Sequence, residues 1–488
     1  MILAIDAGTT GITVLVVDHA GSIIHKSYNE FPQYFPRPGW VEHDPREIWD
    51  TTLLTAQQAI AAIGGPGQLV AIGITNQRET TVVWDRKTLE PVHNAIVWQC
   101  RRSAPICDEL RAQGLEPEIR QRTGLVLDAY FSATKLTWLM RNVPDIKARA
   151  LSGSLAFGTV DSWLIAKLTE GEVHATDMSN ASRTMLYNIH DLSWDPFLLD
   201  TFEVPISLMP EVSPSGHSFG TTRVFGEQIP ITGVAGDQQA ALFGQACFKP
   251  GMSKNTYGTG SFVLTNMGSD KPISEHNLLT SIACGAWGLE RQVTYACEGA
   301  IFVTGAAIQW LRDGLGLITS ASEAGPLAES VSSTDGVYFV PALTGLGAPH
   351  WNPNARGTIT GISRGTTKAH LVRATVEAMA YQTKDVVDAM HADTGVELLE
   401  LRVDGGASVM NVMCQFQADM LQLTVARPVI HETTGMGAAY LAGITHGFWD
   451  GMEDVETRWK VDRRFEPKMS IDERDSLYAG WKRALPAT

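Results

Sequence analysis

Several polar residues that could carry chemistry come soon after apolar, strand-like runs of the sequence. Asp6 follows ILAI, Arg78 and Glu79 come after VAIGIT, Asp237 follows IPITGVAG, and Asp404 follows LELRV. A carboxylate can accept a proton or support a cation, and an arginine beside a glutamate suits a ligand with neighbouring hydroxyl groups. Because ligands of open α/β sheets collect outside the carboxyl ends of the strands, these positions are candidate site residues.

Most of these residues also have a plainer structural interpretation. Arg78 and Glu79 could form a surface ion pair, which contributes only about 0 to 1 kcal/mol to stability. Asp237 could cap the helix expected at QQAALFG, and Trp98 in NAIVWQCRR could belong to the core. Gly236 favours a functional role for Asp237, because a residue without a side chain lets a backbone or a substrate come close.

Two short turns rich in glycine and threonine separate pairs of apolar runs. They are GTTG at residues 8–11 and GTG at residues 258–260. Backbone N–H groups and threonine hydroxyls in such turns can close around a phosphate. The first turn alone is better explained as an ordinary hairpin. Two of them, at the starts of two similar halves, could hold one polyphosphate from both sides.

The predicted elements place these turns in two similar α/β halves. In the first half, three strands precede a helix with Asp44 as its N-cap and Pro45 at its first position, and another strand follows. In the second half, residues 370–390 predict a long helix, and residues 398–421 predict a strand, a Gly-Gly turn and a helix. This order predicts a mixed α/β fold with largely parallel strand pairing.

The length of the chain predicts two domains. Its 488 residues exceed the roughly 250 to 300 that one hydrophobic core supports. We place the boundary near residue 248, which gives an N-terminal domain of residues 1–248 and a C-terminal domain of residues 249–488. The arrangement resembles the ribonuclease H-like ATPase superfold of sugar kinases and actin, in which two duplicated domains have mixed sheets flanked by helices.

The composition narrows the classes of partner and compartment. The formal charge of −15 argues against sequence-independent binding to nucleic acid or to an anionic membrane. Six scattered cysteines without a Cys-x-x-Cys pair indicate reduced thiols in a cytoplasmic protein. The N-terminal run has no basic segment before it, and no apolar stretch reaches the length of a membrane span, so we expect neither a signal peptide nor insertion into a membrane.

Longer motifs carry a family resemblance. YFSATKLTWLMRN (130–142) and GTITGISRGTTKAHLVRATVE (357–377) are similar to the two signatures of the FGGY carbohydrate kinases. PGWVEHDPREIW, NASRTMLYNI, AGDQQAALFGQ and NTYGTG occur along the chain in the order typical of the glycerol kinases of that family. The resemblance covers essentially the whole chain. It implies phosphorylation of glycerol by ATP with Mg²⁺, giving sn-glycerol 3-phosphate.

The resemblance also implies which residues bind glycerol. The polar contacts would come from Arg78, Glu79, Tyr130, Asp237 and Gln238. Trp98 and Phe262 would pack against the carbon face, and Asp237 would be the general base for the attacking hydroxyl. A site that pairs each hydroxyl rejects analogues that lack one, because its own polar groups would be left without partners.

The nucleotide site follows from the same resemblance. Its contacts would be Thr9, Thr10, Gly11, Thr259, Gly305, Gln309, Ala407 and Asn411. Asp6 would position Mg²⁺, in part through water. Glycerol kinases usually have a basic residue where this chain has Thr13, so we expect one positive charge fewer near the transferred phosphate unless another Lys or Arg compensates.

Two alternatives remain open from the sequence. The chain could be an FGGY kinase for another polyol or sugar, which the altered phosphate turn would permit. It could instead be a nucleotide-dependent binding or scaffold protein that has kept the fold and lost turnover. By the same resemblance, we expect a homodimer or homotetramer.

Overall fold

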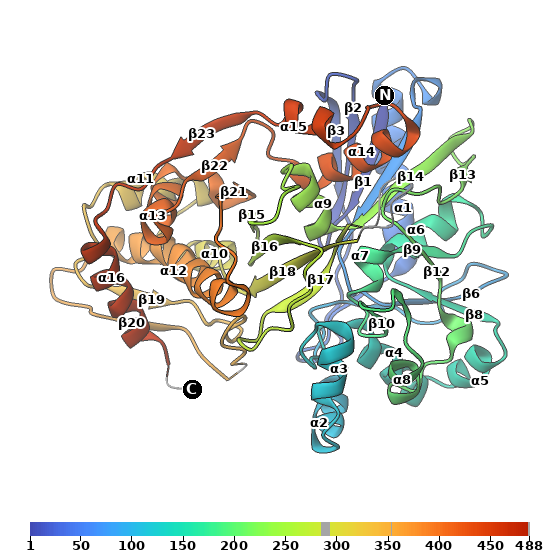
Figure 1. Ribbon diagram of the computed structural model, residues 1–488, viewed down its shortest axis with the longest axis horizontal. Coiled ribbons are helices and arrows are strands. Elements are labelled where there is room, and N and C mark those ends of the chain that lie inside the picture. The colour runs from blue at the N-terminus through green and yellow to red at the C-terminus, as the bar shows by residue number, and fades with distance from the viewer. Residues whose placement is uncertain (285–292, 353, 487–488) are drawn as a thin grey trace.

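The computed structural model describes residues 1–284, 293–352 and 354–486, and it contains two large mixed sheets flanked by helices (Figure 1). In the first sheet, β14, β5 and β1 are parallel neighbours, and the other pairs are antiparallel. The prediction of largely parallel pairing is therefore wrong, because tight turns join β1 to β2 and β2 to β3. The strand order is β13 (Thr221–Thr222), β14 (Ile229–Gly236), β5 (Ala71–Asn76), β1 (Ile2–Ala7), β2 (Gly11–Val17) and β3 (Ile23–Glu30).

The second sheet repeats this pattern. A parallel centre is made by β15, β21 and β22, and antiparallel strands flank it. Each sheet thus begins its parallel centre with the strand that precedes a Gly-Thr turn, which confirms the duplicated architecture. The strand order is β17 (Leu279–Cys284), β18 (Thr294–Ile301), β16 (Ser261–Gly268), β15 (Met252–Tyr257), β21 (Glu400–Asp404), β22 (Val425–Pro428) and β23 (Val461–Phe465).

Helices cover the sheets and join them. On the first sheet, α1 (Pro45–Ala62) and α6 (Val160–Leu168) cover one face, and α14 (Thr433–His446) covers the other. The core beneath α14 contains Ala4 and Leu15 from the first two strands. Helix α9 (Asp237–Gly244) contacts β14 and β5 of the first sheet and β15, β16 and β17 of the second. Helix α14, which lies near the end of the chain, therefore completes the covering of the first sheet (Figure 1). The boundary near residue 248 stays a prediction.

The second sheet packs against helices that follow it in the chain. One hydrophobic cluster joins β21 and β22 to these helices. They are α10 (Gly305–Asp313), α11 (Ala324–Glu329), α12 (Lys368–Thr394) and α13 (Asn411–Leu421). Helix α12 is the long helix predicted from its apolar spacing. Two further helices, α15 (Met452–Arg458) and α16 (Ile471–Ala484), lie near the end of the chain, and β19 (Tyr338–Val340) pairs with β20 (Thr358–Thr360).

The predicted turns and caps are present. Gly8 N–H donates to Gly11 O at 3.0 Å, and Gly258 N–H donates to Gly260 O at 2.8 Å. The side chain of Asp44 accepts from Arg46 N–H at the start of α1, as the sequence predicted.

Most elements between β5 and β13, together with β4, form a region with its own hydrophobic core. This core holds the segment that carries Tyr130 and packs against Trp98. The helices of the region are α2 (Ala104–Ala112), α3 (Glu116–Thr123), α4 (Ser132–Asn142), α5 (Ile146–Leu151), α7 (Met178–Ala181) and α8 (Pro196–Thr201). Short strand pairs connect them: β4 (Glu42–His43) with β7 (Ala95–Ile96), β6 (Val82–Asp85) with β8 (Leu155–Gly158), β9 (Ala175–Asp177) with β12 (Glu211–Ser213), and β10 (Tyr187–Asn188) with β11 (Ser193–Trp194).

Two further findings concern the helices and the cysteine side chains. Over the described ranges, none of the helices combines the length and apolar character that crossing a bilayer requires. Within the same ranges, five cysteines are free and buried: Cys100, Cys107, Cys247, Cys297 and Cys414.

We predict that Gly437→Ala destabilises the protein, although alanine is the better helix former. A Cβ atom at Gly437 would overlap the backbone carbonyl of Ala240 in α9. Such overpacking costs about 1 to 3 kcal/mol and should lower the midpoint of thermal unfolding. Gly325→Ala in α11 is the matched control, since its Cβ would come no closer than 3.4 Å to Met410. Equal midpoints for the two variants would show that α14 and α9 can separate at no cost.

Candidate active site

The parallel strands of the first sheet bring three candidate residues to one edge. Asp6 of β1 is in register with Thr75 of β5, and Asn76 of β5 is in register with Gly236 of β14. The residues just beyond Asn76 and Gly236 include Arg78 and Asp237. The carboxyl ends of β1, β5 and β14 thus meet where the sequence placed a site.

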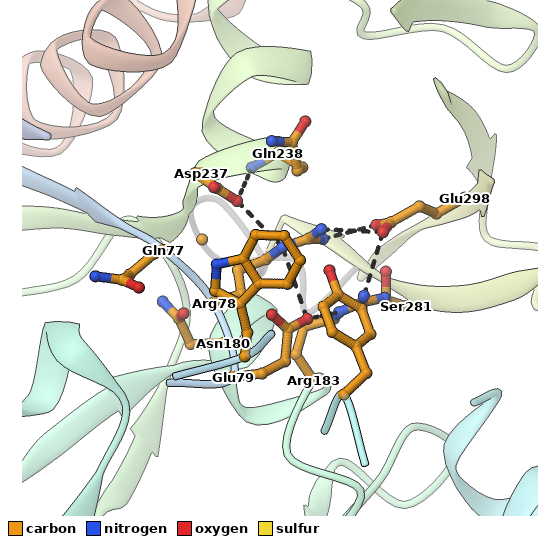
Figure 2. Close-up of polar contacts among 12 residues, drawn as sticks. Gln77, Arg78, Glu79, Asn180, Arg183, Asp237, Gln238, Ser281 and Glu298 are labelled. Carbon is orange, nitrogen blue, oxygen red and sulfur yellow. Dashed lines mark hydrogen bonds and ion pairs between the residues drawn. The ribbon is translucent and has the colours of Figure 1, made fainter. Parts of the chain in front are cut away.

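Arg78 and Glu79 belong to a buried ionic network that joins the two sheets (Figure 2). Arg78 donates from Nη1 and Nη2 to the two carboxylate oxygens of Glu298 in β18, at 2.6 and 2.9 Å. Arg183 donates from Nε to Glu79 Oε1 at 2.7 Å and from Nη2 to Glu298 Oε1 at 3.2 Å. Because all four side chains are at most 2% exposed, Arg78 and Glu79 are not a surface ion pair.

The same arginine holds the candidate base. Arg78 Nε lies 3.1 Å from Asp237 Oδ1, and the Asp237 side chain keeps 28% of its exposure. Burial raises the pKa of Asp237, and the charges of Arg78 and Lys254 oppose that rise. Asp237 is the first residue of α9 rather than its N-cap, which is Gly236. A Cβ at Gly236 would come within 2.8 Å of Arg78 Cγ and Cδ, so it is the arginine that needs glycine there.

Glu79 sits in a strained turn. Its φ is 60°, and Thr80 N–H donates to Arg78 O at 2.7 Å. A bulky residue adopts this left-handed conformation at a cost of about 1 to 3 kcal/mol, and such residues cluster at functional sites. From this turn the Glu79 carboxylate accepts a hydrogen bond from Arg183 Nε.

Aromatic side chains connect the network to the first Gly-Thr turn. The Trp98 ring packs edge-on against Tyr130 at 5.5 Å and against Phe262 at 6.5 Å between centroids. Trp98 Nε1 donates to Thr9 Oγ1 at 3.0 Å. Phe262 lies in β16, two residues after the second turn. Trp98 therefore touches the first turn and the strand that leaves the second, so both turns border one site.

The candidate nucleotide residues of the second half lie around the second turn. Thr304 and Ala306 N–H groups both donate to Thr259 O at 3.0 Å. Gly305 lies between them, and a Cβ there would overlap Gly258 O. Gly405, at φ 82°, packs in the same way on the backbone of Tyr257.

The remaining nucleotide candidates are on neighbouring elements. Gln309 is exposed one turn into α10, and Ala407 lies in the short 3-10 helix of residues 406–409. Asn411 begins α13, where its side-chain oxygen accepts from Arg427 at 3.3 Å. In the first turn, Gly11 is the first residue of β2, and Thr10 O accepts from Phe31 N–H at 3.4 Å.

Asp6 lies in a field of negative charge. Burial, together with the charges of Asp237 and Glu432, raises the pKa of Asp6 to about 8, and Lys26 opposes the rise. Lys26 forms an ion pair with Glu432. Thr13, which stands where a basic residue was expected, is in register with Asp6 on one side and Tyr28 on the other.

Sequence reasoning missed three residues of this site: Arg183, Glu298 and Lys254. Arg183 lies inside the NASRTMLYNI motif and Lys254 directly before NTYGTG, but neither occupies a strand end. Glu298 stands in the middle of β18, where a charged residue flanked by small apolar ones was the only signal.

We predict that Glu298→Gln lowers the free energy of unfolding by about 3 to 5 kcal/mol at pH 7, because it leaves two buried arginines without their shared carboxylate. Arg183 and Arg78 lower the pKa of Glu298 to about 2, from an ordinary value of 4.5. The deficit is therefore complete above pH 4.5 and disappears as the pH falls toward 2. Denaturant unfolding at several pH values measures it. Glu90→Gln, which breaks an exposed pair with Arg46, is the control and should cost about 0 to 1 kcal/mol.

Comparison with known proteins identifies the family. Residues 1–244 match the N-terminal domain of the FGGY family of carbohydrate kinases, and residues 253–446 match its C-terminal domain. The sequence is 55% identical to glycerol kinase 2 of Thermotoga maritima, covering 99% of this chain and 98% of that protein. It is 56% identical to the glycerol kinase of Petrotoga mobilis, covering 99% and 97%.

Solved structures agree with the sequence comparison. The crystal structure of Plasmodium falciparum glycerol kinase with ADP superposes with a TM-score of 0.93 at 36% identity, covering 100% of this chain and 98% of that one. A xylulose kinase from Lactobacillus acidophilus superposes with a TM-score of 0.87 at 19% identity, covering 99% and 96%, and that likeness concerns the fold alone. The protein thus belongs to the FGGY family of carbohydrate kinases.

Proposed function

We propose that this protein transfers the terminal phosphoryl group of ATP to glycerol and forms sn-glycerol 3-phosphate. The observation that carries the proposal is the contact of Arg78 with Asp237, at 3.1 Å, beside aromatic side chains that touch the first Gly-Thr turn and the strand after the second. A candidate base, several buried polar side chains and the two Gly-Thr turns are thus close together. The relatives that are 55 and 56% identical carry the name glycerol kinase, which supports the choice of substrate.

The polar and apolar groups of the site suit a small triol. Arg78, Glu79, Tyr130, Asp237 and Gln238 offer donors and acceptors for hydroxyl groups. Trp98 and Phe262 offer a wall for the carbon chain. Arg78 and Glu79 are already held by Glu298 and Arg183, so they lose little freedom when a substrate binds.

Asp237 is the general base in this proposal. Its carboxylate accepts the proton of a terminal hydroxyl, and the freed oxygen forms a bond to the terminal phosphorus as the bond from that phosphorus to the bridging oxygen of ADP breaks. Arg78 Nε keeps the carboxylate in place and favours its ionised form.

The nucleotide contacts are proposed at the two turns and their neighbours. Backbone N–H groups of the two turns, other than those of Gly8 and Gly258, which already donate within the turns, would hold phosphate oxygens. Mg²⁺ binds to proteins through one or two carboxylates and keeps several waters. Asp6, whose pKa is raised by burial and then by the charges of Asp237 and Glu432, is the carboxylate proposed for that role. When bound with ATP, Mg²⁺ neutralises charge on the transferred group.

Compartment and assembly are part of the proposal. Free, buried cysteines suit a reducing environment, so we place the protein in the cytoplasm. We also propose a homodimer or homotetramer, on the resemblance to the glycerol kinases.

We predict that purified protein prefers glycerol to erythritol, xylulose and gluconate by at least about 10²-fold in kcat/KM. Longer substrates must displace the aromatic wall or leave a buried polar group without a partner. Coupled measurement of ADP release with each substrate tests this. A preference for one of the other substrates would assign the protein to a different FGGY kinase activity, and no ADP release with any of them would favour the binding or scaffold alternative.

We predict that Asp237→Ala lowers kcat by about 10²-fold or more while the protein stays folded, because the attacking hydroxyl loses its proton acceptor. Asp237→Asn keeps the shape of the side chain and should show the same loss. Circular dichroism and thermal unfolding check the fold of both. Near-normal turnover of either variant would remove Asp237 from the role of base.

A further inference from the structure

Lys254 is a buried cation whose role the proposed reaction leaves unexplained. It lies in the middle of β15, in register with Leu264 of β16 and Arg402 of β21, and is 0% exposed. Its ammonium donates to Gln238 Oε1 and, at 3.0 Å, to Thr256 Oγ1. A buried ammonium is costly unless it is paired and hydrogen-bonded, so these contacts hold Lys254 in one place.

The contact with Lys254 decides which end of the Gln238 amide is free. An ammonium can only donate, so the oxygen of the amide must face it and the NH₂ group must point elsewhere. Among the described residues, no side chain or carbonyl accepts a hydrogen bond from Gln238 Nε2. Gln238 is 7% exposed and follows Asp237 directly at the start of α9. Gln238 Nε2 is not one of the buried unpaired atoms of the described residues, so it is accessible beside the proposed base and free to donate to a ligand.

Lys254 also balances the charge of the site. Arg78 and Arg183 face three carboxylates, those of Glu79, Asp237 and Glu298. Lys254 supplies a third positive charge, which acts on Asp237 and Glu298 of the site and also on the buried Asp404. It does so from the second sheet, whereas Gln238 and Asp237 stand on α9, which packs against both sheets.

We propose that Lys254 is a positioning residue for the substrate: it fixes the amide of Gln238 so that Nε2 donates to a substrate hydroxyl. This inference rests on the proposed function of the same site. A hydroxyl that accepts from Gln238 must donate its own proton to another group, and the carboxylates of Asp237 and Glu79 are the acceptors of the site. Lys254 thereby sets the direction of the hydrogen bonds that the substrate makes.

A double-mutant cycle tests the inference. Lys254→Met and Gln238→Met should each raise the KM for glycerol by about tenfold, the effect of one lost hydrogen bond, with little change in kcat. Because Lys254 acts through Gln238, the double variant should have the KM of Gln238→Met alone. Effects that multiply in the double variant, or a loss confined to kcat, would overturn the inference.

Gln238→Glu gives an independent test of the inference if Lys254→Met does not fold. A glutamate keeps an oxygen for Lys254 but has no N–H to offer, so the KM for glycerol should rise as in Gln238→Met. An unchanged KM would mean that the substrate faces an oxygen at this position, which contradicts the inference. Thermal unfolding shows which variants are folded.

Lys384→Met is the matched control for removing a largely buried lysine. Lys384 lies in α12 and pairs with Asp388 at 2.8 Å, so its loss should leave the KM for glycerol unchanged. If the wild-type protein prefers another polyol, the proposed choice of glycerol fails, and the same cycle is measured on the preferred polyol. The test of the positioning role of Lys254 therefore does not depend on which polyol the protein prefers.

Discussion

The bidentate ion pair between Arg78 and Glu298 is the interaction on which the site depends. Its two partners are buried and come from different halves of the fold, so without the other each would lose a bidentate partner and keep only weaker ones, Arg183 for Glu298 and Asp237 for Arg78. The contact fixes the guanidinium, and the remaining Nε then faces Asp237. The close approach of Arg78 to Gly236 places the start of α9 against the same group. One arginine thus sets the distance between the two sheets and the position of the proposed base.

Much of the fold could be predicted because its signals are local. Helix α1 begins at a proline behind a capping aspartate, and the two Gly-Thr turns separate short apolar runs, so each shows within a few residues of sequence. The pairing of the strands is not local. Apolar strands covered on both faces look alike whether their neighbours run parallel or antiparallel, which is why mixed sheets were expected correctly but the share of parallel pairs in them was overestimated.

Without the family resemblance, the candidate site could be predicted only where its residues follow a strand. Asp6, Arg78 and Asp237 were found in this way, and register brings their strands together. Glu298 and Lys254 lie within strands, where sequence alone does not show that the facing surface is another charged element rather than solvent. Their partners are 220 and 16 residues away in the chain, and packing alone brings each pair together. Likewise, the burial of Arg78 and Glu79 depends on a sheet made by the other half.

Because helix α14 lies near the end of the chain, the first sheet can be covered only when synthesis is almost complete. The strands that begin at residue 2 leave the ribosome early, whereas residues 433–446, which cover their apolar face, leave it near the end. During most of translation, Ala4 and Leu15 therefore belong to an uncovered surface of the kind that attracts chaperones and other nascent chains. A polypeptide that stops before residue 433 keeps that surface bare, so quality control can distinguish an interrupted product from a finished one by its first sheet.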